Sequence, residues 1–211
     1  MKSLALGFIL SISFNLYAKS DLGRILLKDN YAPAIKPGFT TKIGIFSTDG
    51  CSAFPDGIIP NKTTEWLHCC IKHDIDYWIG GRKELKKISD KNLRSCVSDS
   101  VGSLIGMSMD LGVTIGGVPS LLPWRWAYGW DYPIAYDELT KVQLISAAAK
   151  YDTVIDSIRE QKELLTPLQI LSIDIKLRSK LMELYPFLGN NAKEKSSEYK
   201  RLIDRINEEL R

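Results

Sequence analysis

The feature that most constrains the fold is the run HCCIKHDIDYW, from His68 to Trp78, which gathers many of the chain's reactive side chains. The chain has 211 residues, with only two histidines and four cysteines. Both histidines and three of the cysteines lie between Cys51 and His73. A metal site, a disulfide scaffold and acid–base catalysis each account for part of this cluster. The compartment helps to decide between them, because thiols stay reduced in the cytosol and pair outside it.

The N-terminal residues indicate export. Lys2 precedes an apolar run that extends from Leu4 to about Leu16, and Ala18 offers a small residue for cleavage, which is the layout of a signal peptide. We therefore expect residues 1–18 to be removed and the mature protein to be secreted or periplasmic. In such a compartment the four cysteines form a natural two-disulfide set, namely Cys51, Cys69, Cys70 and Cys96.

Two other ligand classes are less well supported. A zinc site could use Cys69, Cys70, His68 or His73, but the chain has no well-spaced second pair of ligands. His68 is therefore expected to be structural or exposed. The net charge of +3 is too small, and the charges too evenly mixed, to indicate nucleic-acid binding.

Apolar periodicity predicts an all-α fold. Trp66, Cys69, Cys70, His73 and Tyr77 recur at helical spacing, with Thr63 or Thr64 as the N-cap and Gly80-Gly81 as the stop. A second helix is expected from Arg82 to about Val97, and the short connection predicts an antiparallel hairpin.

The rest of the chain divides into two regions. Residues 19–136 form the domain that carries the hairpin. Within this domain, the sequence of residues 101–122 predicts a buried helix followed by a glycine-rich loop. A membrane span there is disfavoured, because Asp110 would cost about 3 kcal/mol in the bilayer. Residues 137–211 form a helical extension, with helices expected at 138–163, 167–185 and 193–210.

The hairpin brings candidate reactive groups together. His73 and Tyr77 share one row of the first helix, whereas Asp74 points about 100° away from His73. Asp90 lies on an apolar face of the second helix and needs a polar partner, for which His73 and Tyr77 are the candidates. Helical rise makes a Cys69–Cys96 bridge compatible with a His73–Asp90 contact.

A bridge between Cys51 and Cys70 would bring the loop 48–57 beside Asp74. A loop of turn residues facing a carboxylate outlines a calcium site, because calcium takes about six to eight oxygen ligands. Asp56 could equally be a calcium ligand or a turn residue, whereas for Asp49 the role of a turn residue is favoured. The candidate ligands are Asp74, Gly50, Ser52, Phe54 and Asp56. A neutral histidine that is held by a carboxylate and lies next to a dication can activate a water molecule for attack on a carbonyl carbon.

The segment Cys69-Cys70-Ile71-Lys72-His73-Asp74-Ile75-Asp76-Tyr77 resembles the active-site signature of the secreted phospholipase A2 superfamily. Asp90, with Cys96 six residues later, resembles the family's second catalytic segment, and Cys51 stands where its calcium loop carries a cysteine. The resemblance covers Asp49–Val97.

This resemblance implies a phospholipase A2-type hairpin with His73 as general base, Asp74 as calcium ligand and Asp90 as the residue that orients His73. Tyr77 would bond to Asp90, and the reaction would be calcium-dependent hydrolysis of the sn-2 ester of a glycerophospholipid. The chain departs from the animal enzymes in its loop, DGCSAFPDG, and in carrying far fewer cysteines, and it lacks their β-wing. It is therefore more similar to bacterial phospholipase A2-like proteins.

Two further surfaces are candidates for binding. Trp124, Trp126 and Trp130 could form a lipid-interface patch for a phospholipid membrane, with a core cluster as the alternative. The last helix has a narrow apolar stripe that suits packing on the body or on a protein partner, made by Leu202, Ile203, Ile206 and Leu210. A catalytically silent membrane- or protein-binding module is the alternative function.

Overall fold

The structure is a computed structural model that describes residues 42–52, 54, 56–57, 64–120, 122–131 and 134–211. The predicted signal peptide at 1–18 and the N-cap candidate Thr63 lie outside these residues. Within the described part the regular elements are helices, and an isolated β-bridge joins Ile43 to Trp130. The all-α prediction is confirmed for this part. The helices are α3 Leu67–Ile79, α4 Lys83–Val101, α5 Ser103–Gly116, α6 Lys141–Ala149, α7 Asp152–Gln161, α8 Pro167–Leu184 and α9 Ala192–Glu209, with 3₁₀ turns at Lys162–Leu164 and Tyr185–Phe187.

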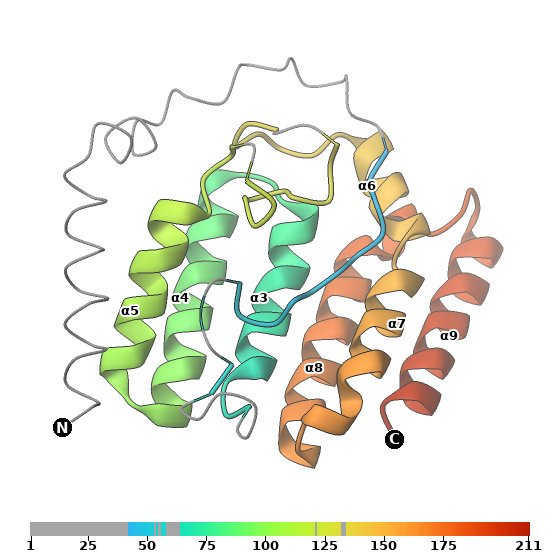
Figure 1. The fold of residues 1–211 in the computed structure, drawn as a ribbon. Coiled ribbons are helices and arrows are strands. Elements are labelled where there is room, and N and C mark those ends of the chain that lie inside the picture. Colours follow the sequence, from blue (N-terminus) through green and yellow to red (C-terminus); the bar gives the residue numbers. More distant parts are fainter. Residues whose placement is uncertain (1–41, 53, 55, 58–63, 121, 132–133) are drawn as a thin grey trace, which may run out of the picture.

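The helices α3, α4 and α5 lie side by side, and α7, α8 and α9 form a second group beside them (Figure 1). The turn between α3 and α4 depends on Gly80, which has φ 77° and donates its N–H to the carbonyl of Asp76. A Cβ on Gly80 would lie 2.3 Å from the Cβ of Ala127, so glycine also permits this close approach.

The start of α3 differs from the expected N-cap. Trp66 occupies the N-cap position without a side-chain cap, and the hydroxyl of Thr64 donates to the carbonyl of Leu164 instead. A bond to a residue 100 positions away has replaced the local cap. Sequence pattern predicts caps from local neighbours only, which is why it missed this contact.

The helix predicted within 101–122 exists as α5, but the expectation that it is buried is wrong. Only Gly106 and Met109 of α5 are buried, and the side chain of Leu104 is 80% exposed. Among the described helices, none is both long and apolar enough to cross a bilayer. The helix instead covers α4 along one face, where Gly106 allows contact: a Cβ there would lie 2.2 Å from Ser98 Oγ.

The single helix expected at 138–163 is divided into α6 and α7. The division falls at Tyr151, which is fully buried and whose hydroxyl donates to the carbonyl of Leu177 in α8. By contrast, α8 and α9 lie close to their predicted ranges. Thr166 and Gln169 form a capping box at the start of α8, and Asn191 caps α9.

One apolar core joins α3 to the C-terminal helices. Ile71, Ile75 and Trp78 of α3 are at most 1% exposed and belong to the same cluster as Tyr151, Ile155 and Leu177. The stripe of α9 packs into this cluster, with Leu202, Ile206 and Leu210 buried and Ile203 partly buried. The stripe is therefore used for packing on the body. A smaller cluster around the cysteines lies between α3, α4 and α5.

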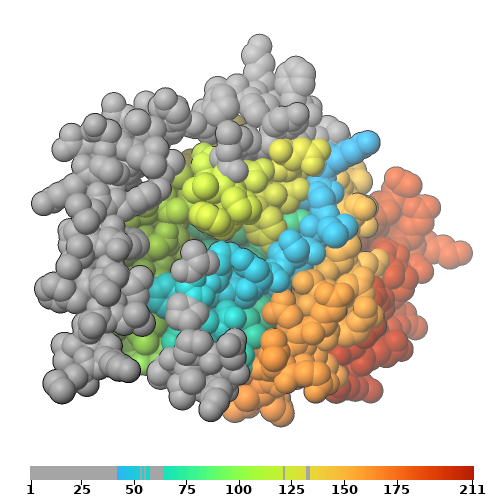
Figure 2. Space-filling view, in the orientation of Figure 1, coloured from blue at the N-terminus to red at the C-terminus, as the bar shows by residue number. Residues whose placement is uncertain are grey.

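The N-terminal part of the described chain crosses between the two helix groups (Figure 2). The N–H of Ile43 donates to Ser146 Oγ of α6, and the N–H of Phe46 donates to Thr153 Oγ1 of α7. Gly44 donates to the carbonyl of Gly129. This segment leads into the loop at Thr48 and so fixes that loop over α3.

The structure corrects the proposed tryptophan patch. Trp126 and Trp130 are each 1% exposed, and their indole N–H groups donate to the carbonyls of Gly81 and Ile79, both at 2.8 Å. They close the end of α3 and do not face lipid. Trp124 is 41% exposed. Trp126 and Trp130 can be buried because the end of α3 and the residue that follows it provide a carbonyl acceptor for each indole N–H.

Candidate active site

Two disulfides hold the site elements together. Cys69 and Cys96 join α3 to α4 with a Cα–Cα distance of 5.8 Å, and Cys51 and Cys70 join the loop to α3 at 5.2 Å. No described cysteine is free. The two-disulfide prediction is confirmed, and the bridges are compatible with a location outside the cytoplasm. The first bridge fixes α4 beside the part of α3 that carries His73, and the second fixes the loop beside the part that carries Asp74.

The centre of the site is a bonded pair of buried side chains. His73 Nε2 of α3 lies 3.0 Å from Asp90 Oδ1 of α4, and the Tyr77 hydroxyl donates to the same oxygen at 2.7 Å. His73, Asp90 and Tyr77 are 7%, 6% and 2% exposed. The antiparallel hairpin thus brings together the three residues that the sequence picked out.

Lys86 is a fourth member of this group, which the sequence pattern alone did not identify. Its ammonium donates to Asp90 Oδ2 at 2.7 Å, and the residue is 5% exposed. A signal was present, because Lys86 lies four residues before Asp90 on the apolar face that continues through Leu93 and Val97. A lysine on such a face needs an acidic partner as much as an aspartate needs a basic one.

The electrostatics keep Asp90 ionised. Burial alone raises the pKa of Asp90, but the hydrogen bond from His73 and the charge of Lys86 outweigh burial and hold that pKa below its usual value. Burial and the neighbouring Asp90 charge raise the pKa of Tyr77 well above its usual value, so Tyr77 remains a neutral donor. An ionised Asp90 can only accept, so His73 Nε2 carries the proton and donates the hydrogen bond to Asp90 Oδ1, which leaves Nδ1 as the free acceptor of the neutral ring.

The other side of the His73 ring faces Asp74. Asp74 Oδ1 lies 4.0 Å from His73 Nδ1, and Asp74 Oδ2 accepts a hydrogen bond from the Thr48 hydroxyl at 2.6 Å. Burial raises the pKa of Asp74, and the bonds from its neighbours only partly offset that effect. In the part of the chain that is described, its one ion-pair partner within 4.0 Å is His73. A buried carboxylate without a lysine or arginine beside it suits a bound cation.

The loop in front of Asp74 is closed by Asp56. Asp56 Oδ1 accepts the N–H of Cys51 at 2.8 Å, and Gly50 has φ 80°, where a Cβ would lie 2.4 Å from that oxygen. Ser52 Oγ donates to Asp49, and the N–H of Phe54 donates to the Cys51 carbonyl. Asp56 therefore acts as a turn residue, because its side chain binds the backbone of the loop.

The two acids of the loop do not both join Asp74 in one cluster. Among the described residues, Asp49, Asp56 and Asp74 do not form a group of ligand atoms within 4.8 Å of one another. Thr48 contacts Asp74 directly, and the sequence analysis did not single it out. A cation at Asp74 would have the Thr48 hydroxyl oxygen beside the carboxylate, and the charge of Asp49 lies near enough to raise the pKa of Asp74.

His68 belongs to a separate cluster beside the inter-helix disulfide. Its Nε2 lies 3.5 Å from Cys69 Sγ and 3.4 Å from Cys96 Sγ. Cysteine binds zinc as a thiolate, and these two sulfurs are bonded to each other, so the cluster does not offer zinc a ligand set in this state. Burial and the charge of Lys72 lower the pKa of His68 to about 4, which keeps the ring neutral at pH 7.

The glycine-rich end of α5 lies against Tyr77. A Cβ on Gly117 would lie 2.4 Å from the Tyr77 hydroxyl, so only glycine permits the chain to approach at this point.

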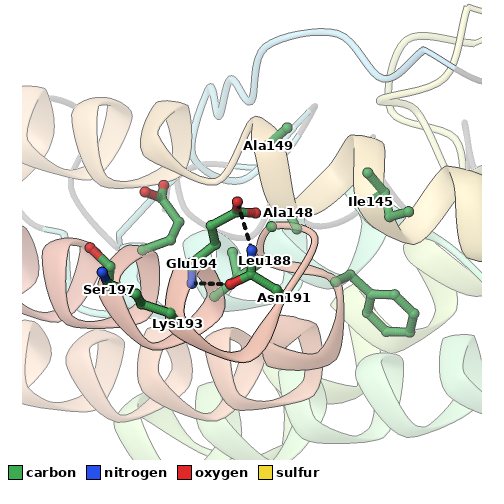
Figure 3. A pocket seen from close by; sticks show the side chains of 11 residues that line it. Ile145, Ala148, Ala149, Leu188, Asn191, Lys193, Glu194 and Ser197 are labelled. Atoms are coloured by element: carbon green, nitrogen blue, oxygen red, sulfur yellow. Dashed lines mark hydrogen bonds between the residues drawn. The ribbon is translucent and has the colours of Figure 1, made fainter.

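A surface pocket of 750 Å³ lies elsewhere, between α6 and α9 (Figure 3). Its main polar contact pairs Glu194 with Asn191, which caps α9. None of the site residues lines it. The bonds of Glu194 are those of helix capping, and we assign the pocket no chemistry.

No protein-family model, curated protein or solved structure matches the chain. A function for this protein therefore has to follow from the geometry around His73.

Proposed function

We propose that the protein is a calcium-dependent esterase of the phospholipase A2 type that hydrolyses the sn-2 ester of glycerophospholipids. The observation that supports this most is the placement of one imidazole between two carboxylates. His73 Nε2 is held by Asp90 at 3.0 Å, and His73 Nδ1, on the other side of the ring, faces Asp74 at 4.0 Å. Such a ring is oriented by one acid and presents its free nitrogen toward the other.

In this proposal His73 is the general base. Its Nδ1 takes a proton from water while the water oxygen attacks the ester carbonyl carbon, and Asp90 stabilises the imidazolium through the Nε2–H bond. When the ester C–O bond breaks, the imidazolium returns that proton to the leaving alcohol oxygen. Tyr77 holds Asp90 through its hydroxyl and contacts no reacting atom in this scheme.

Calcium would be held by Asp74. The candidate partners are the Thr48 hydroxyl and the backbone carbonyls of Gly50, Ser52 and Phe54, while Asp56 closes the loop. Bound there, calcium supplies positive charge for the oxyanion of the ester. What supports this fit is that Asp74 is a largely buried carboxylate with a hydroxyl oxygen beside it, and calcium prefers oxygen ligands that include carboxylates.

Substitution of His73 tests the base. In His73→Gln we expect fatty-acid release from phospholipid vesicles with calcium to fall by about 10³-fold, since general-base catalysis contributes on that order. His68→Gln is the matched control, because it removes the chain's other histidine and should retain activity. Release at the wild-type rate by a folded His73→Gln protein would refute the base assignment.

Chelation tests calcium in the same assay. We expect EDTA to abolish wild-type activity and added calcium to restore it, because Asp74 alone leaves the oxyanion without a positive charge. Activity that persists in EDTA contradicts the role of Asp74. Vesicle binding by a wild-type protein that releases no fatty acid would favour the silent binding module.

A further inference from the structure

Lys86 is a buried lysine whose ammonium has three neighbours from three helices. It lies 2.7 Å from Asp90 Oδ2 on its own helix and 3.1 Å from the carbonyl of Val113 in α5. It also lies 5.4 Å from the centre of the Tyr77 ring in α3. Lysines are almost never fully buried unless they are paired, so this site is built around the ion pair with Asp90.

The two oxygens of Asp90 are divided between two sets of donors. Oδ1 accepts from His73 and Tyr77, whereas Oδ2 accepts from Lys86. Without Lys86, the carboxylate would be free to turn about its Cβ–Cγ bond and would have an unsatisfied buried oxygen. The direction in which Oδ1 points, and with it the orientation of the His73 ring, therefore depends on Lys86.

The contact to Val113 extends this dependence to α5. Val113 belongs to the last turn of α5, and its carbonyl accepts both the N–H of Gly117 at 2.9 Å and the ammonium of Lys86 at 3.1 Å. Gly117, just after α5, approaches the Tyr77 hydroxyl from the same end. α5 thus contacts the supports of Asp90, although it supplies no group that touches His73.

We propose that Lys86 is a positioning residue, which fixes Asp90 through its second oxygen and so holds the His73 ring in its working orientation. The structural part of this proposal stands on the contacts above. Its kinetic part rests on the proposed esterase function.

A spectroscopic test addresses the structural part without any assay of activity. The chain has only two histidines, so an imidazole ¹H–¹⁵N NMR spectrum can be assigned with His68→Gln. In Lys86→Met, which keeps the side-chain length and removes the charge, we expect the His73 Nε2–H signal to move upfield and exchange faster with water. In Lys87→Met, which changes the next, exposed lysine of α4, the signal should stay as in wild type.

A kinetic test addresses the role in catalysis. We expect Lys86→Met to lower kcat by about 10- to 100-fold while KM changes less than about twofold, since misplaced catalytic groups cost rates of this order. Ethylammonium should restore part of kcat in Lys86→Ala, because Asp90 itself lines a groove of 300 Å³, together with Lys87, Lys91, Arg94, Ser95, Asp110 and Thr114. Lys87→Met should keep wild-type kcat and show no response to the amine.

The outcomes separate this inference from the proposed function. A folded Lys86→Met protein with the wild-type His73 signal overturns the positioning role, as does unchanged kcat in an active enzyme. If wild type releases no fatty acid, the proposed function fails and the imidazole signal alone decides the role of Lys86. If Lys86→Met does not fold, Lys86→Gln takes its place, and wild-type behaviour of that variant overturns the inference equally.

Discussion

At the scale of single residues, the two histidines of this chain show how surroundings set chemistry. Burial lowers the pKa of His73, but bonds and charge from Asp74 and Asp90 outweigh burial and raise that pKa above its ordinary value. Burial and Lys72 lower the pKa of His68 to about 4. The two rings lie five positions apart on one helix. One has carboxylates for neighbours, whereas the other has a disulfide and a lysine.

The lowered pKa of His68 predicts a loss of stability in acid. The unfolded chain binds a proton at His68 near pH 6.5, whereas the folded chain does so only near pH 4, so falling pH favours the unfolded state between these values. The whole difference between the two pKa values would correspond to about 3 kcal/mol. Because His68 is only half-buried and solvent screens it, we expect the loss of unfolding free energy to be on the order of 1–2 kcal/mol. Urea unfolding at pH 7 and pH 4.5 measures it.

His68→Gln is the control for this prediction. The variant should lose less stability than wild type over the same pH range, by that same amount. His73 contributes with the opposite sign, because its raised pKa gives stability that is complete below pH 6.5 and is lost as pH rises through the folded value. This contribution is common to both proteins and cancels. Equal pH dependence in both proteins would contradict the assignment.

At the scale of elements, α3 contacts different helices through two of its faces. One face carries the site toward α4, and the other is bound to α8 by polar contacts. Lys72 Nζ donates to Ser172 Oγ at 2.6 Å, and Asp76 pairs with Lys176 at 2.6 Å and Lys180 at 3.2 Å. Burial raises the pKa of Asp76, but the two lysines outweigh burial and hold that pKa below its usual value. Asp76 thus fixes α8 behind the site.

Loss of the Asp76 charge should weaken the fold strongly. In Asp76→Asn we expect the free energy of unfolding to fall by about 3 kcal/mol, because the largely buried Lys176 loses its counter-charge and Lys180 keeps only Glu183. Glu198→Gln is the control: it breaks an exposed pair with Arg201 on α9 and should cost less than about 1 kcal/mol. Urea unfolding at pH 7 compares them, and similar losses in both variants would disprove the special role of Asp76.

At the scale of the whole molecule, the predicted domain and its helical extension share one core. Ile71, Ile75 and Trp78 of the site helix pack in the same cluster as Ile155 and Leu177 of the C-terminal helices. A core shared in this way predicts that the two regions unfold together. The site helix therefore depends for its stability on residues at least 77 positions away in the chain, which is the separation of Trp78 and Ile155.

Hydrogen exchange tests this coupling. Leu177→Ala removes a fully buried side chain of α8, and we expect a loss of about 2–5 kcal/mol in the free energy of unfolding. The slowest amides of α3 should lose the same protection as those of α8. Leu168→Ala, on the exposed face of α8, should leave both unchanged. Unchanged protection in α3 after Leu177→Ala would show two independent units instead.

The sequence by itself determined what depends on spacing within one segment. Helical periodicity put His73 and Tyr77 in one row, and Asp90 on an apolar face. The spacing of the cysteines then agreed with bridges that join loop, α3 and α4. These relations are local or bridge short separations, because a helix sets its own neighbours at three and four residues.

Tertiary structure decided what depends on which segments meet. It gave Thr64 a partner in Leu164 in place of a cap, divided the helix at Tyr151, and buried Trp126 and Trp130 against the end of α3. It also supplied Thr48 to Asp74 and placed the carbonyl of Val113 beside Lys86. A buried polar group takes the partner that packing brings near it, and sequence spacing carries no record of that partner when it lies in a distant segment.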